Sequence, residues 1–122
     1  MSVRPHKTLK LWQEAIDFVP EIYAILKSYP DDEKFGLISQ IKRASSSISI
    51  NIAEGAARSS KKEFVRFLYY SMGSISELDT LFEISLKLGY LSLDNYTLLI
   101  EKLNKLSALA NGLIISLKKD IT

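Results

Sequence analysis

The chain has 122 residues, of which 47% are hydrophobic and 25% are charged, and it contains no cysteine. This length suits one domain with its own core and is short for an enzyme with an enclosed active site. The lack of cysteine excludes disulfides and thiolate metal sites, so we expect a cytoplasmic protein. No apolar run approaches the roughly 18 residues of a membrane span, and the start of the chain lacks the apolar core of a secretory signal.

The net charge of +2 conceals a separation of charges along the chain. Residues 14–33 carry six acids and one lysine, a net charge of −5, whereas residues 42–66 carry six bases and two acids, a net charge of +4. Arg4, Lys7 and Lys10 add basic charge near the N-terminus. A basic segment of this kind suits contact with nucleic acid, but scattered surface charge would give the same sequence pattern.

We expect residues 1–8 to form a flexible N-terminal arm and residues 9–122 to form a single domain. Thr8 is the expected N-cap of the first helix. Two apolar seams then follow at steps of three and four residues, which is the helical period. They consist of Leu9, Trp12, Ile16, Val19, Tyr23 and Leu26, and of Leu11, Ala15, Phe18, Ile22, Ile25 and Tyr29. Pro20 is expected to kink this helix without ending it, because the period continues beyond it.

The second expected helix begins near Leu37, and the rest of the chain is arranged around it. It has an apolar stripe, a polar band along one edge, and a side of small residues that another helix can approach closely. These three sets are Leu37, Ile41, Ala44, Ile48, Ile52 and Gly55; Gln40, Arg43, Ser47, Glu54 and Arg58; and Ser46, Ser49, Ala53 and Ala57.

Three features of this helix need an explanation. Asn51 lies on the apolar stripe, where its amide needs a hydrogen bond, and we expect it to set the register of helix pairing. Gly55 costs about 1 kcal/mol relative to alanine inside a helix, and close packing of another backbone would offset that cost. Glu54 lies one turn from Arg58, which leaves open either an ion pair or a binding contact.

Ser60 followed by Glu63 is a capping box, so the third helix should begin at Lys61. It should run to Leu88, with Gly89 as its C-cap. Its expected seam consists of Phe64, Leu68, Ser71, Ile75, Leu78, Phe82 and Ser85. Tyr69 and Tyr70 follow Arg66 and could stack on bases, or they could lie in an interface or at the edge of the core.

Ser92 is the expected N-cap of a fourth helix, whose seam keeps the same alternation. This seam consists of Tyr96, Leu99, Leu103, Leu106, Ala110, Leu113 and Leu117. Four helices with short connections predict an all-α fold, an antiparallel up-and-down four-helix bundle.

The chain lacks the groups that most enzyme classes need. The only histidine, His6, lies in the arm, which excludes a bundle di-iron site. There is no glycine-rich phosphate loop, and the serines at 45–47 have no histidine base, although a serine–lysine arrangement stays open. We therefore expect no enzymatic activity, no metal and no cofactor.

The run QIKRASSSISINIAEGAARSSKKEFVRFL resembles the centre of a bacterial family of four-helix-bundle proteins. This family includes proteins encoded in intervening sequences of large-subunit ribosomal RNA genes. A related branch is the accessory variability protein, which assists the reverse transcriptase of diversity-generating retroelements. SISINIAEG is the most specific match, and LKLWQEA, YPDDEKFGLISQIKRA and GSISELDT are similar to other parts of the family pattern.

The resemblance implies a ring-shaped assembly, a homopentamer, with a positively charged surface that meets nucleic acid. It supplies no enzymatic activity. The residues that match the family pattern position by position, as motif residues, are Arg43, Asn51, Glu54, Gly55 and Arg58.

Two functions are compatible with these observations. The first is a homo-oligomer that binds RNA or DNA through phosphate contacts, with Asn51, Glu54 and Gly55 in structural roles. The residues expected to bind nucleic acid are Arg43, Arg58, Lys61, Lys62 and Arg66. The second is a scaffold for a protein partner such as a reverse transcriptase or polymerase. Neither function involves a membrane.

Overall fold

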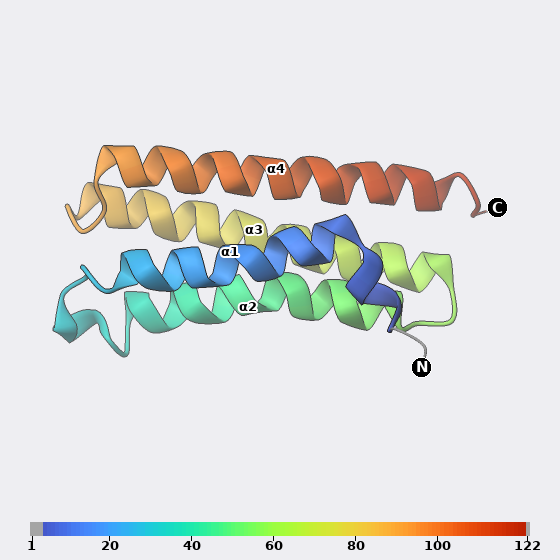
Figure 1. The fold of residues 1–122 in the computed structure, drawn as a ribbon, viewed down its shortest axis with the longest axis horizontal. Coiled ribbons are helices and arrows are strands. Elements are labelled where there is room, and N and C mark those ends of the chain that lie inside the picture. Colours follow the sequence, from blue (N-terminus) through green and yellow to red (C-terminus); the bar gives the residue numbers. More distant parts are fainter. Residues whose placement is uncertain (1–3, 122) are drawn as a thin grey trace.

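The computed structural model describes residues 4–121 and contains four long helices, with no strand in this part of the chain (Figure 1). They are α1 (Lys10–Leu26), α2 (Leu37–Ala56), α3 (Lys61–Lys87) and α4 (Leu93–Lys118). Two short 3-10 turns, η1 (Pro5–Thr8) and η2 (Asp31–Glu33), precede α1 and α2. The predicted all-α class and the four helices are confirmed.

Each long helix packs against two neighbours, α1 and α3 both contacting α2 and α4. In Figure 1 the α1–α2 and α3–α4 connections lie at one end of the bundle. The α2–α3 connection lies at the other end, together with η1 and the end of α4. The largest fully buried hydrophobic side chains come from α1, α2 and α3 and form one core: Ile22, Ile41, Ile48, Ile52, Leu68, Leu78 and Phe82.

Two of the predicted caps are present. The Ser60 hydroxyl accepts a hydrogen bond from the Glu63 backbone N–H at 3.1 Å, and α3 begins at Lys61 as expected. The Ser92 hydroxyl likewise accepts from the Asn95 N–H at 3.1 Å. The helix α3 ends at Lys87 with Leu88 as its C-cap, one residue earlier than predicted, and Gly89 follows the C-cap with a φ of +79°, a conformation that glycine adopts without steric cost. Short local sequence motifs therefore specify these connections between the helices.

The start of α1 differs from the prediction. The N-cap position is Leu9, and the Thr8 hydroxyl instead donates to the Pro5 carbonyl at 3.2 Å inside η1. The helix continues through Pro20, as predicted from the continuing period. The predicted flexible arm, residues 1–8, falls partly on residues 1–3, which lie outside the described residues. Within the rest of that arm, the His6 ring packs edge-on against Trp12 at 4.9 Å.

The two apolar seams of α1 have different surroundings. Leu11, Ala15, Phe18 and Ile22 are buried in the core. On the other seam, Ile16 is 39% exposed and Tyr23 is 38% exposed, while Trp12 and Val19 are half-buried. One apolar side of α1 is therefore only partly covered within a single chain.

The predicted stripe of α2 is confirmed, since Leu37, Ile41, Ala44, Ile48, Ile52 and Gly55 are all buried. On the small-residue side Ser49 is buried, Ser46 and Ala53 are half-buried, and Ala57 is exposed. In α4 the seam shifts near its end: Ile114 is buried in place of the predicted Leu113, which is half-buried.

Candidate nucleic-acid interface

The α2–α3 joint begins with a close approach of two helices at Gly55. A Cβ atom placed on Gly55 would lie 2.8 Å from the Phe67 Cβ, 2.9 Å from the Phe64 Cδ1 and 3.2 Å from the Phe64 carbonyl oxygen. Such distances leave no room for a side chain. The prediction that Gly55 permits close packing of another backbone is confirmed, and this packing fixes where α3 starts.

Serine hydroxyls make the polar contacts between α2 and α3. Ser71 donates to the Ile48 carbonyl at 2.9 Å, and Ser47 donates to the Ser74 hydroxyl at 2.6 Å. The Asn51 Nδ2 donates to the Ser47 carbonyl of its own helix at 2.9 Å, so the amide has the hydrogen bond that its position requires. The register-setting role of Asn51 stays a prediction.

Arg58 follows the last turn of α2 and turns toward α3. Its guanidinium carbon lies 4.6 Å from the centre of the Phe67 ring, a cation–π distance. Within residues 4–121, Glu54 and Arg58 form no ion pair, so that alternative is wrong. Glu54 itself is exposed on the outer side of α2. Arg58 thus contacts an aromatic ring of another helix and not the carboxylate one turn away on its own helix, which only the tertiary structure reveals.

Lys61 and Lys62 occupy the first turn of α3 and have different partners. The Lys61 Nζ contacts the Asp120 carboxylate at 2.6 Å, which ties the start of α3 to the end of α4. Lys62 is exposed and lines an open surface groove of about 510 Å³ with Glu63, Val65, Arg66, Tyr69 and Tyr70.

Arg66 lies one turn further along α3 and has two partners on its own helix. Its Nε donates to the Tyr70 hydroxyl at 2.8 Å, and its Nη1 lies 3.3 Å from the Glu63 carboxylate. The Tyr70 hydroxyl, which accepts this bond, and the Glu63 carboxylate both raise the pKa of Arg66 above its ordinary value. Like any arginine, Arg66 is charged at physiological pH.

Arg43 is exposed on α2 but lies apart from the other four predicted binding residues. Fifteen residues of helix separate it from Arg58, which corresponds to about 22 Å along the axis. The structure thus brings Arg58, Lys61, Lys62 and Arg66 together and leaves Arg43 several turns away.

The end of the bundle that holds the α2–α3 joint is strongly basic. Three segments, residues 4–10, 54–66 and 118–121, meet at this end, and we call it the basic end (Figure 1). It holds nine lysines and arginines against three acids: Arg4, Lys7, Lys10, Arg58, Lys61, Lys62, Arg66, Lys118 and Lys119 against Glu54, Glu63 and Asp120. The connections at the opposite end, residues 27–36 and 83–94, hold three lysines against five acids. Sequence reasoning missed the contribution of α4, because Lys118 and Lys119 lie far from residues 42–66 in the chain.

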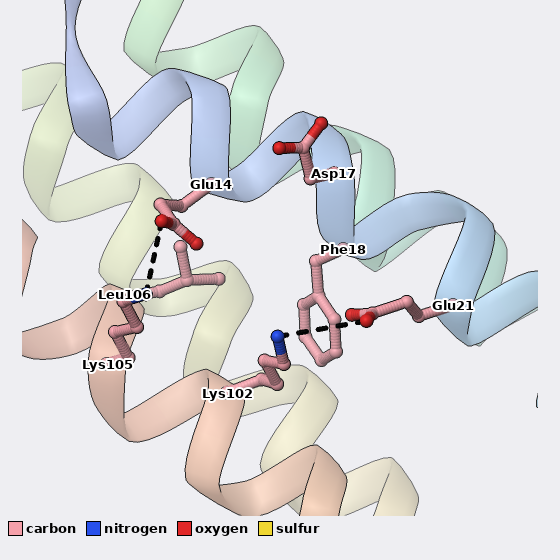
Figure 2. Close-up of a pocket in the computed structure, with 7 residues that line it drawn as sticks. All are labelled: Glu14, Asp17, Phe18, Glu21, Lys102, Lys105 and Leu106. Carbon is pink, nitrogen blue, oxygen red and sulfur yellow. Dashed lines mark hydrogen bonds and ion pairs between the residues drawn. The ribbon is translucent and has the colours of Figure 1, made fainter.

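A second charged region lies between α1 and α4 and has a different character (Figure 2). Lys105 pairs with Glu14 at 3.1 Å and Lys102 pairs with Glu21 at 3.7 Å, beside a cavity of about 130 Å³. Both lysines are paired with carboxylates here, and Asp17 adds a third acid to the lining of the cavity. Among residues 4–121, no group of three acidic or histidine side chains is placed to hold a metal ion, and no helix is long and apolar enough to span a membrane.

The family model of the 23S rRNA-intervening sequence protein matches residues 7–112. The chain belongs to this family. The matched part of the chain includes α1, α2, α3 and all five residues predicted to bind nucleic acid. No curated protein matches the chain.

Proposed function

We propose that this protein is a non-enzymatic homo-oligomer that binds RNA or DNA through phosphate contacts at the basic end. The observation that supports this function is the excess of six positive charges where three separate segments meet. Lysine and arginine side chains that neutralise phosphates release condensed counterions, so binding of this kind weakens steeply with salt. Arg43, on the outer side of α2, would contact a longer nucleic acid that extends beyond this end.

A gel-shift titration tests the proposal with structured RNA and duplex DNA at low and at physiological salt. Binding at micromolar protein and low salt, weakened by more than tenfold at physiological salt, is the expected result. No shift with either nucleic acid at low salt would overturn it.

The oligomer in this proposal is a ring of antiparallel up-and-down bundles. The alternating positions of the helix connections support the antiparallel course, and the partly exposed seam of α1 supports the assembly. Ile16 and Tyr23 keep more than a third of their surface exposed on this seam. Apolar surface of this kind is characteristic of contacts between subunits. Light scattering should give a mass several times that of one chain, and a monomer at micromolar concentration would contradict the ring.

A second candidate function is a scaffold for a protein such as a reverse transcriptase. It is favoured by exposed apolar side chains at the end opposite the basic end, where Phe35 is 89% exposed, Leu88 53% and Leu93 66%. The genes beside this one distinguish the two functions. A neighbouring reverse transcriptase gene would support the scaffold, whereas a position inside a ribosomal RNA gene would support nucleic-acid binding.

A further inference from the structure

Tyr69 and Tyr70 lie on the surface of α3 beside the basic end and do not belong to the hydrophobic core. Tyr69 is 48% exposed and Tyr70 is 46% exposed, whereas Phe18, Phe67 and Phe82 are buried. Both tyrosines lie on the third turn of α3, beside the cations described above. Adjacent exposed aromatic rings within a basic surface call for a ligand that has both negative charge and flat apolar faces.

A cation is bound at the hydroxyl end of each ring. Lys118 Nζ donates to the Tyr69 hydroxyl at 2.8 Å yet lies 5.2 Å from the ring centre, so the ammonium lies beyond the hydroxyl and not on the face of the ring. The Arg66 guanidinium, bonded to the Tyr70 hydroxyl through Nε, lies 5.7 Å from that ring centre. These contacts orient both rings, and about half of the surface of each tyrosine stays exposed.

The core supports Tyr70 from beneath. The buried Phe67 ring packs against Tyr70 at 5.4 Å with an interplanar angle of 80°, which is an edge-to-face contact. Side chains on a helix lean toward its N-terminus, so Tyr69 and Tyr70 lean toward Val65, Arg66 and Lys62. The groove of about 510 Å³ is therefore bordered by two oriented rings, by Lys62 and Arg66, and by the Glu63 carboxylate that pairs with Arg66.

We propose that this groove binds single-stranded nucleic acid, with bases stacked on Tyr69 and Tyr70 and phosphates on Lys62 and Arg66. Sites that bind single strands without sequence preference combine aromatic rings, on which bases stack, with cations that contact the phosphates. The bases of a duplex are already stacked on one another and cannot reach the rings. An acidic peptide would use the cations but has no flat faces for the two tyrosines. This inference rests on the proposed nucleic-acid binding and specifies that the bound nucleic acid is single-stranded.

Fluorescence anisotropy with three labelled probes tests the inference. They are an oligothymidylate of about ten nucleotides, a fully abasic strand of the same length, and a hairpin duplex with the same number of phosphates. The wild-type protein should bind the oligothymidylate at least about fivefold more tightly than the abasic strand, given the usual strength of base–aromatic stacking. The hairpin should bind like the abasic strand.

The variants separate stacking from charge. Tyr69→Ala with Tyr70→Ala should abolish the preference for the oligothymidylate and leave the affinity for the abasic strand within about twofold. Tyr69→Phe with Tyr70→Phe keeps the ring faces and should keep the preference. Phe35→Ala, which removes an exposed aromatic ring at the opposite end of the bundle, should have no effect on it. Thermal unfolding followed by circular dichroism verifies that each variant folds.

Each contrary result has a distinct meaning. Equal affinity of the wild-type protein for the oligothymidylate and the abasic strand would overturn the stacking and leave phosphate binding intact. A preference that survives the double alanine variant would also overturn it. Displacement of the oligothymidylate by polyglutamate, as effectively as by unlabelled oligothymidylate at equal charge, would assign the groove to acidic peptides instead. No binding of any probe at low salt would remove the proposed function itself.

Discussion

The interface between α2 and α3 differs from the interface between α1 and α4 in both packing and charge. At the first, Gly55 brings the helices into contact and two serine hydroxyls bridge them. At the second, open spaces of about 130 and 350 Å³ lie between the helices, and two lysine–glutamate pairs bridge the first of them. The tight interface fixes the joint that carries the excess cations of the basic end. At the loose interface, the cations Lys102 and Lys105 form ion pairs with acids of the same interface.

The difference separates two uses of lysine in one small protein. Lys102 and Lys105 have carboxylates opposite them, so they add little to the field outside the molecule. At the basic end nine cations share three acids, and the remaining charge acts outward. Whether a lysine can attract an anionic ligand therefore depends more on the acids beside it than on the net charge of the chain.

Gly55→Ala should have the largest effect, because it breaks the tight interface. The new Cβ would lie under 3 Å from the Phe67 Cβ and the Phe64 ring, and the Phe67 backbone cannot move aside without shifting α3. We expect the free energy of unfolding to fall by about 2 kcal/mol, after allowance for the better helix propensity of alanine. Urea denaturation measures it. Gly73→Ala is the matched control, since nothing lies within 4 Å of a Cβ there, and it should not destabilise the protein.

Charge reversal tests whether the two sets of lysines differ in function. Lys62→Glu should weaken binding of nucleic acid by about tenfold and lower the slope of log affinity against log salt by about one. Lys102→Glu changes the net charge of the chain by the same amount, from +2 to 0, and should leave affinity within about twofold. Filter binding across a salt series measures both. Equal losses in the two variants would show that overall charge alone controls binding.

Gly112→Ala should stabilise α4, the helix on one side of the loose interface. Gly112 is exposed on α4 beside the space lined by Leu9, Leu109 and Leu113, and a Cβ there would meet nothing within 4 Å. Alanine is the better helix former, so the free energy of unfolding should rise by up to about 1 kcal/mol. Urea denaturation under the conditions used for Gly55→Ala gives the comparison. A loss of stability would mean that another subunit occupies this space.

Glu14→Gln should have the smallest effect. It removes the charge that pairs with Lys105, an ion pair whose lysine side chain is half exposed to solvent. Exposed pairs of this kind contribute about 0.2–1 kcal/mol, and we expect a loss below about 0.5 kcal/mol that disappears in high salt. Thermal unfolding at low and high salt measures it. A loss that persists in high salt would assign Glu14 a packing role.

Features that depend on neighbouring residues along the chain were predictable from the sequence. The four helices, the caps at Ser60 and Ser92 and the close approach at Gly55 follow from helical period, hydrogen-bonding side chains and the cost of glycine in a helix. Three of the five predicted binding residues, Lys61, Lys62 and Arg66, lie within one stretch of α3, so their proximity was also predictable.

Contacts between distant segments were not predictable. The sequence does not indicate that the Arg58 guanidinium contacts Phe67 and not Glu54. It also does not indicate that Lys118 donates a hydrogen bond to Tyr69, which lies 49 residues away in the chain. Arg43 shares a polar band with Arg58 on a helical projection, but such a projection omits the rise along the axis. Likewise, only the structure shows that the Asn51 amide donates a hydrogen bond to a carbonyl of its own helix.

Phe67 belongs to the interior and to the candidate binding surface at once. Its Cβ limits how closely Gly55 can approach, its ring lies under the Arg58 guanidinium, and the same ring packs edge-to-face against Tyr70. Substitutions at Phe67 would thus alter folding and binding together, so mutational scans cannot separate the two there. An engineer who wants a stable but non-binding chain should keep Phe67 and change Lys62, which has no comparable tie to the core.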